Sequence, residues 1–192
     1  EQHGRDTSSV KALMGIIHEH IVKSMNTRFV VDILFHSGYA SSTPTVLKES
    51  GMDQVSAILV PESQRAGFLQ KHFGKCGLLF EPLVFGTARR LLPEYKGGLW
   101  NFHELSNGGM FMSPDVSGTI RLSSAEMTGF SGDVSGEVAG IIVTLFALDA
   151  FVRLLSDRGL EDQSDDACDL YYALRDYGLS HERAVEIYSA ID

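Results

Sequence analysis

The chain has 192 residues, a formal net charge of −9 at pH 7, and 44% hydrophobic and 21% charged residues. This length and composition are typical of one globular domain with at most a small appendage, and they exclude collagen-like, disordered and disulfide-framework proteins. The excess of 25 acidic over 16 basic residues also argues against a protein that holds nucleic acid mainly through phosphate contacts.

The N-terminal part of the sequence predicts a helix, a strand and a linker. Apolar residues recur at helical spacing from Val10 to Met25, after a Thr-Ser-Ser run that can cap a helix. Residues 29–35 are a β-branched and aromatic run typical of a strand, and residues 37–56 are rich in Ser, Thr, Gly and Pro. His18 and His20 stand two apart on the predicted helix and therefore face different sides, which argues against a metal site.

Two helices are predicted in the next segment. Pro61 is a good first helical residue, and the apolar face over residues 68–73 can end at Gly74. A second helix is predicted from Pro82 to Leu92, because Pro93 cannot continue it.

The centre of the sequence predicts a small antiparallel sheet, a meander or hairpin around residues 98–123. Strands are expected over 98–105, 110–113 and 119–123. The Asn107-Gly108 step between the first two apolar runs is the strongest hairpin signal in the sequence.

Helices are predicted again in the C-terminal part. Ser135 can cap a helix whose most apolar stretch, from Val138 to Leu148, is shorter than the roughly 20 residues that span a bilayer, so a buried helix is expected. Two shorter helices are expected over 166–177 and 180–190, with a break at Gly178. The predicted fold class is therefore α+β, with a small antiparallel sheet packed against several helices.

The acidity is concentrated near the end of the sequence. Residues 157–192 contain 10 acidic and 3 basic residues, whereas residues 1–51 are neutral overall. This pattern indicates either a solvated face on the terminal helices or a surface that attracts a basic partner. The charge is too small for wholesale mimicry of a DNA duplex.

The two cysteines and the N-terminal residues indicate the cellular compartment in which the protein is expected. Cys76 and Cys168 lie far apart with no metal-ligand spacing, which favours reduced thiols, although one disulfide stays open as an alternative. Residues 1–6 lack the basic and then apolar order of a signal peptide. We therefore expect a cytoplasmic protein without a membrane anchor.

The chemistry-bearing residues of the predicted hairpin do not form an obvious catalytic pair. His103 and Glu104 are adjacent on a strand and so point to opposite faces. The sequence also contains no Gly-x-Ser-x-Gly elbow and no Walker loop. We expect no enzymatic activity, no catalytic residues, no cofactor and no metal. The polar residues around the hairpin tip are either an interaction patch or part of the scaffold.

Residues 95–114, from Tyr95 to Pro114, resemble the signature block of the ArdB/KlcA antirestriction proteins. Flanking segments are similar to the same family: residues 60–74, residues 84–91, residues 139–148 and the stretch from Leu170 to Asp192. The resemblance covers about residues 57–192, in order and without large gaps.

The resemblance implies a cytoplasmic α+β protein of plasmids and other mobile elements that inhibits type I restriction-modification systems. It implies a non-catalytic interaction with the restriction complex, without a small-molecule substrate and without direct nucleic-acid binding. From the block we take a candidate interaction surface, which consists of Trp100, Asn101, His103, Glu104, Ser106, Asn107, Gly108 and Gly109.

Residues 1–51 have no counterpart in this resemblance. We predict that they are an extension, fused or read through, and that residues 52–192, from Met52 onward, form the antirestriction-like domain.

Two other functions remain as alternatives. A small hydrolase or transferase using His103 or Glu104 would need these groups in one cleft. A DNA-binding accessory protein would need a contiguous basic surface. The residues that could supply it are Lys71, Lys75, Arg89, Arg90 and Lys96.

Overall fold

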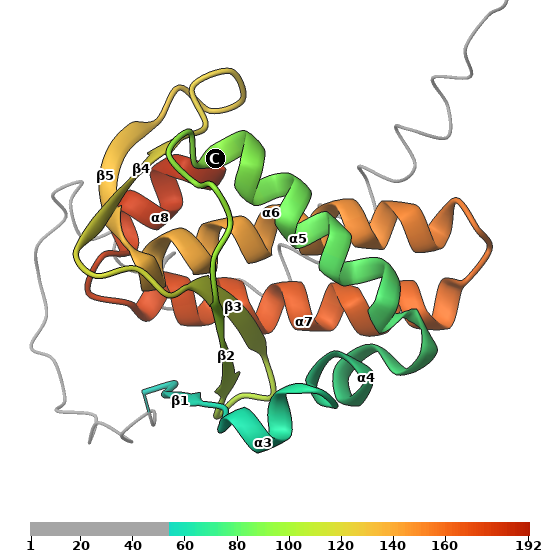
Figure 1. Ribbon diagram of the computed structural model, residues 1–192. Helices are drawn as coiled ribbons and strands as arrows, with labels where there is room; N and C mark the ends of the chain where they lie inside the picture. Colours follow the sequence, from blue (N-terminus) through green and yellow to red (C-terminus); the bar gives the residue numbers. More distant parts are fainter. Residues whose placement is uncertain (1–53) are drawn as a thin grey trace, which may run out of the picture. The chain divides into compact units, whose positions relative to one another are not determined.

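The structure is a computed structural model that describes residues 54–192 (Figure 1). These residues belong to a single unit that extends from Gly51 to Asp192. The helix predicted over 10–25, the strand over 29–35, the two histidines near residue 20 and nearly all of the 37–56 linker lie outside the described residues. The division into an extension and a domain at residue 51 stays a prediction.

Three strands of the unit form an antiparallel sheet. Its strands are β1 (Ala57–Leu59), β2 (Trp100–Leu105) and β3 (Met110–Pro114), in the order β1-β2-β3. The predicted hairpin between β2 and β3 is confirmed, with His103 opposite Phe111. Strand β1 was not predicted; it begins directly after the linker predicted over residues 37–56.

The third predicted strand does not continue this sheet. Strand β4 (Thr119–Ser123) has the predicted bounds, but it pairs with β5 (Ser131–Ser135) in a separate two-stranded sheet. A single meander over residues 98–123 is therefore wrong, although the α+β class is confirmed. The physical reason is that a helix occupies the outer edge of β3, where a third strand would have to pair.

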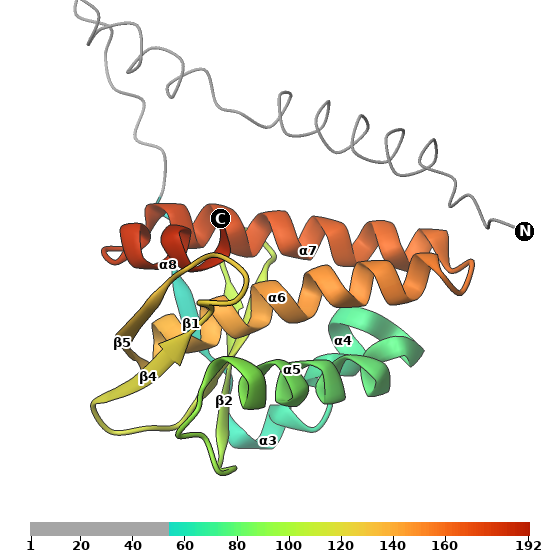
Figure 2. The same ribbon diagram turned by 90° about the horizontal axis from the view of Figure 1, so that it is seen from above.

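That helix is α6 (Gly136–Ser156), which lies between α5 (Gly77–Leu91) and α7 (Glu161–Ser180) (Figure 2). Its start was predicted correctly, because the Ser135 hydroxyl accepts a hydrogen bond from the backbone N–H of Val138 at 3.2 Å. The helix passes Asp149 without interruption. It is the one helix of the described part that is long and apolar enough to span a membrane, yet 67% of its most apolar window is buried inside the protein.

Two small residues of α6 fit the helix to β3. Gly140 faces the strand so closely that an added Cβ would lie 2.4 Å from the Ser113 Cβ and 2.5 Å from the Met112 carbonyl oxygen. One turn later, the Thr144 hydroxyl accepts a hydrogen bond from the Met112 N–H at 3.1 Å and donates one to the Met112 carbonyl at 3.2 Å. The helix therefore satisfies the polar groups of the strand edge as well as covering them.

The helices before the hairpin differ from their predicted bounds. The segment after Pro61 forms two short helices, α3 (Glu62–Arg65) and α4 (Phe68–Phe73), and Gly74 ends α4 with a φ of 53° as expected. After a 3₁₀ turn (Gly74–Cys76), helix α5 begins at Gly77 and contains Pro82 in its interior.

Pro82 was wrongly predicted to start α5, because burial of the preceding turn outweighs the hydrogen bond that proline cannot make. Phe80 in that turn is fully buried, and its ring centroid lies 4.5 Å from that of Phe73 and 5.3 Å from that of Phe151. Aromatic packing of this kind fixes the helix start regardless of the proline that follows.

Gly178 was wrongly predicted to break the C-terminal helices. Helix α7 runs through it to Ser180, and α8 (Ala184–Ile191) follows after a short turn. A Cβ on Gly178 would lie 3.2 Å from Ile187 and 3.6 Å from Ile141. The glycine therefore allows close packing of α7 against α6 and α8. The two cysteines are both free thiols.

Candidate functional site

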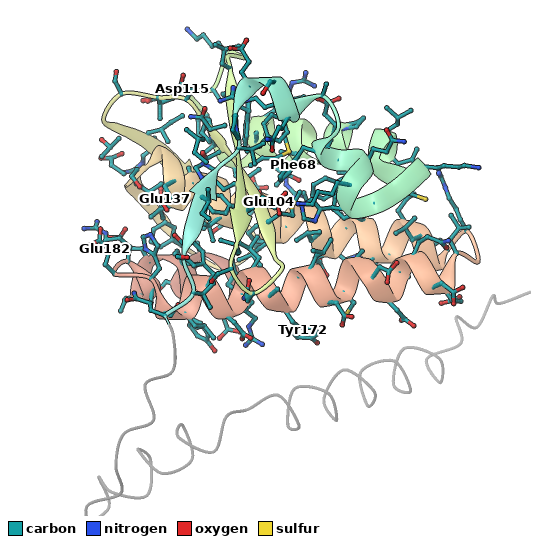
Figure 3. All side chains as sticks on the ribbon, turned by 90° about the horizontal axis from the view of Figure 1, so that it is seen from below. Phe68, Glu104, Asp115, Glu137, Tyr172 and Glu182 are labelled. Atoms are coloured by element: carbon teal, nitrogen blue, oxygen red, sulfur yellow. The ribbon has the colours of Figure 1, made fainter. Side chains whose placement is uncertain are left out.

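The hairpin sends His103 and Glu104 to opposite faces of the sheet, as the strand alternation predicts. Figure 3 shows Glu104 beside Phe68 of α4, with Glu137 of α6 on the other side of the strands. The cleft that the hydrolase or transferase alternative requires is therefore not formed by His103 and Glu104.

Glu104 is held by two basic side chains of α4. Its Oε1 lies 2.7 Å from Lys71 Nζ and 3.2 Å from His72 Nε2. Burial acts to raise the pKa of Glu104, but the hydrogen bonds and charges of Lys71 and His72 outweigh it, so the pKa is below its ordinary value. Burial lowers the pKa of His72 despite the neighbouring carboxylate, so a neutral ring donates to Glu104 at pH 7.

His103 occupies a drier environment on the other face. Its ring stacks on Phe111 with centroids 4.2 Å apart, and its Nε2 lies 3.0 Å from the hydroxyl oxygen of Ser113. Burial lowers the pKa of His103 below its ordinary value. A serine hydrogen-bonded to an imidazole resembles a nucleophile and its base, but Ser113 is only 4% exposed beneath helix α6. The pair therefore joins β2 to β3 inside the fold.

A second polar cluster adjoins this face. The Tyr177 hydroxyl of α7 donates to Glu137 Oε1 at 2.9 Å, and His181 Nε2 lies 3.8 Å from the same oxygen. Burial and this hydrogen bond raise the pKa of Tyr177 far above its ordinary value, so the phenol stays protonated as the donor. Glu137 thus ties the first turn of α6 to the end of α7.

Other residues of the block bind other elements of the fold. Asn101 Oδ1 accepts a hydrogen bond from Arg65 of α3 at 3.2 Å, and the Ser106 hydroxyl accepts one from the backbone N–H of Ser56 at 3.0 Å. Trp100 is only 5% exposed and donates from its indole to the Tyr95 hydroxyl. Trp100 therefore belongs to the core, contrary to its place in the predicted surface.

The tip of the hairpin rests on α7. Asn107 donates from its side-chain amide to the backbone carbonyl of Ala173 at 2.8 Å and accepts from the N–H of Gly109 at 3.1 Å. Gly108 has a φ of 86°, as the turn requires. Gly109 is buried, and a Cβ there would lie 3.0 Å from the Cβ of Ala173. Gly109 therefore lies inside the fold beneath the tip, contrary to its place in the predicted surface.

A polar hollow lies between this tip, α4 and α7; we call it the tip hollow. Its volume is about 380 Å³. The residues that line it are Lys71, His72, Asn107, Gly108, Asp166, Asp169, Leu170 and Ala173. It brings two of the predicted features together, the hairpin tip and the acidic C-terminal segment, beside the basic side chains that hold Glu104.

The sequence indicated the acidic C-terminal segment as a surface for a basic partner, but it did not single out the residues of α7 that line the tip hollow. Asp166 and Asp169 are exposed and lie far from residue 107 in the sequence. The only signal for them was the concentration of acidic residues after residue 157. Within residues 54–192, no three His, Cys, Asp or Glu side chains come together as metal ligands.

The basic residues proposed for the DNA-binding alternative do not form one surface. Lys71 and Lys75 lie before the start of α5, whereas Arg89 and Arg90 lie in its last turn. A 15-residue helix is about 22 Å long, at roughly 1.5 Å per residue, so the two groups are well separated. The contiguous basic patch that this alternative needs is therefore not formed.

Two half-buried histidines, His72 and His103, predict a fold that is less stable in mild acid. The pKa values of His72 and His103 are both lowered from 6.5, so between pH 6.5 and those lower values the unfolded chain binds more protons than the folded one. We therefore expect the free energy of unfolding, measured by urea denaturation, to decrease as the pH is lowered from about 7.5 to about 5.5.

The matched variant for this prediction is His103→Asn, which removes one of the two groups and keeps a polar side chain. We expect it to lower stability at neutral pH and to reduce the slope of stability against pH. A slope equal to that of the unaltered protein would contradict the assignment of His103. The lowered pKa of Glu104 does not interfere. The stability that it contributes is present above the ordinary pKa of 4.5 and is lost only as the pH falls below that value.

Comparisons with known proteins place these features in a wider context. A family model described as antirestriction protein matches residues 93–192. Two Escherichia coli proteins named antirestriction protein KlcA are 37% and 40% identical over 139 and 141 residues, which is 72% of this chain and 95% and 94% of the relatives. The uncharacterised protein YfjX of E. coli K12 is 35% identical over 142 residues.

One solved structure is also similar, with a TM-score of 0.66 and 37% identity over 76% of this chain and 100% of the solved chain. It comes from work on the KlcA and ArdB proteins, which show a novel fold and antirestriction activity against type I DNA restriction systems in vivo but not in vitro.

Proposed function

Because the chain belongs to the antirestriction protein family, we propose that it protects mobile-element DNA by inhibiting type I restriction-modification systems in the cytoplasm. The observation that carries this proposal is the similarity of this chain to the two KlcA proteins in sequence and to the solved structure in fold. The similarity extends over nearly the whole length of each of these proteins. The relatives act in vivo but not in vitro, so the decisive assay is one in living cells.

The proposed inhibition is non-catalytic and depends on contacts with protein. Supporting this, the reactive side chains of the block are occupied in holding the fold: His103 binds Ser113, and Glu104 binds Lys71. Ser113 is the only hydroxyl within residues 54–192 to which His103 is hydrogen-bonded, so Ser113→Ala separates the two possibilities. Protection that survives this substitution supports a binding function, whereas its loss in a folded variant would support the hydrolase or transferase alternative.

The tip hollow is the surface that we propose contacts the restriction complex. It presents the exposed hairpin tip next to Asp166 and Asp169, and a carboxylate surface attracts a basic protein region. The same charges repel DNA phosphates, which is consistent with a protein that binds no nucleic acid directly. The acidic patch is local, so it suits one edge of an interface rather than imitation of a duplex.

The cellular test is the plating efficiency of unmodified phage on cells that carry a type I system. We expect expression of this protein to raise plating toward the level seen on cells without the system, and to leave plating unchanged when the system is absent. Unchanged plating with folded protein present in the cells would contradict the proposed function.

A charge-reversal pair tests the proposed surface. We expect Asp166→Lys combined with Asp169→Lys to abolish most of the protection, because both side chains are exposed and line the tip hollow. The control is Asp157→Lys combined with Glu182→Lys, which reverses the same number of charges at exposed residues outside the hollow. If the pair protects as well as the control, the interface lies elsewhere.

A further inference from the structure

A second hollow of about 380 Å³ lies where the chain leaves helix α5 and approaches β2; we call it the loop hollow. Six residues line it: Phe85, Arg89, Tyr95, Lys96, Gly97 and Gly98. None of them lines the tip hollow, and the proposed antirestriction surface does not use them.

The charged side chains of the loop hollow are both cations. Arg89 comes from the last turn of α5 and Lys96 from the loop that follows, and no acidic side chain lines the hollow. In the described residues, neither Arg89 nor Lys96 forms an ion pair or a side-chain hydrogen bond. The helix dipole favours one exposed arginine at this helix end, but it does not account for a second cation that faces the same space from the loop.

Two aromatic rings form a wall of the hollow. Phe85 and Tyr95 are half-buried, and each packs edge-on against Trp100 with ring centroids 5.7 Å apart. The Trp100 indole donates a hydrogen bond to the Tyr95 hydroxyl oxygen at 2.6 Å. Because that oxygen already accepts this bond, the phenol hydrogen is free to point away from Trp100 and donate to a ligand.

The remaining lining is bare backbone. Gly97 and Gly98 have φ values of 98° and 149°, and a Cβ on either would meet no atom within 4 Å. No backbone hydrogen bond in the described part of the chain uses the N–H of either glycine. The lining groups therefore offer a guanidinium, an ammonium, a phenol hydrogen and two amide hydrogens, all of which are donors.

We propose that the loop hollow binds a free nucleotide. Cations and amide donors suit a phosphate group, with the guanidinium able to form two parallel hydrogen bonds. The Phe85 and Tyr95 rings suit a planar base that stacks or packs against them. The volume lies within the roughly 300–1,000 Å³ typical of small-ligand sites.

The charge of the whole protein favours a free nucleotide over a nucleotide within a strand. Electrostatic fields are screened over about 8 Å at physiological salt, so a small ligand in the hollow responds mainly to Arg89 and Lys96. A longer polyanion would extend over the rest of a molecule whose net charge is −9. Repulsion along its length would oppose binding.

Trp100 makes the test direct, because it is the single tryptophan of the chain and contacts Tyr95 in the wall of the hollow. Its fluorescence can be followed while the full-length protein is titrated with AMP, ADP, adenosine, inorganic phosphate or a ten-residue oligothymidylate. We expect a saturable change with AMP and ADP, and binding of adenosine and phosphate that is weaker by about tenfold or more.

Three variants locate the site. We expect Arg89→Ala and Lys96→Ala each to weaken ADP binding by about tenfold or more, since each removes a charged donor. Arg90→Ala is the matched control, because Arg90 is the exposed neighbour of Arg89 and does not line the hollow; its affinity should be unchanged.

Three results would overturn the proposal. These are no saturable binding of AMP or ADP, equal losses in Arg89→Ala and Arg90→Ala, and tighter binding of the oligonucleotide than of ADP. The first would remove the site, the second would indicate non-specific charge attraction, and the third would indicate a single-stranded nucleic-acid site. The titration contains no restriction system, so its outcome is independent of the phage assay.

Discussion

Replacing Gly140 with alanine is expected to lower the free energy of unfolding by about 3 kcal/mol or more, the upper part of the range for overpacked cores. The new Cβ would lie 2.4 Å from the Ser113 Cβ and 2.5 Å from the Met112 carbonyl oxygen, both on strand β3. No rotation of an alanine side chain can relieve contacts this short. Helix α6 or strand β3 must therefore shift, and α6 is packed on both sides by other helices.

Gly86 supplies the matched control for this prediction. It is also a helical glycine, but it is exposed in α5 and a Cβ there would meet nothing within 4 Å. Alanine at an exposed helix interior is more favourable than glycine, so Gly86→Ala should stabilise the protein by roughly 0.5–1 kcal/mol. Urea unfolding of the two variants measures both the expected loss of stability in Gly140→Ala and the expected gain in Gly86→Ala. A Gly140→Ala variant as stable as the parent would mean that α6 does not approach β3 this closely.

The local elements were predictable where one short signal decides the structure. The Asn-Gly step correctly predicted the β2–β3 hairpin, and Ser135 correctly predicted the start of α6. The apolar run after Ser135 correctly predicted a buried helix. Each signal acts through residues within a few positions of one another. Predictions that depended on distant packing failed: Pro82 lies inside α5 because Phe80 is buried, and Gly178 lies inside α7 because Ile187 packs against it.

The pairing of strands was less predictable than their positions. Strand β4 has the predicted bounds, but its partner is β5, because the edge of β3 is already occupied by Thr144 and Gly140 of α6. The residue pattern predicts the strand, but it does not predict that a helix distant in the sequence covers the edge with which the strand would pair. Likewise the tip hollow joins residue 107 to α7, and no local pattern places Asp166 beside the hairpin tip.

The signature block has a mainly architectural role in this structure. Asn101 binds α3, Glu104 binds α4, and Asn107 binds the α7 backbone, so one hairpin connects three separate helices. Substitutions at these three positions therefore remove contacts within the fold as well as changing any surface that the block presents. The interface is better tested at exposed positions beside the hairpin, such as Asp166 and Asp169, whose side chains form no hydrogen bond or ion pair within residues 54–192.

The hydroxyl of Thr144 is expected to be worth about 3 kcal/mol to the stability of the protein. Thr144→Val preserves the shape of the side chain, so it leaves no cavity. It removes the group that accepts a hydrogen bond from the Met112 N–H and donates one to the Met112 carbonyl. Thr144 and Met112 are fully buried, so water cannot replace either bond.

Thr144→Ser is the control, because it keeps the hydroxyl and loses only one methyl group. We expect it to cost about 1 kcal/mol, the value of a buried methyl or methylene group. The order of stability by urea unfolding should be the parent, then the serine variant, then the valine variant. If valine were tolerated better than serine, packing alone would hold α6 to β3. The hydrogen bonds of Met112 would then have no part in keeping β4 from the edge of the sheet.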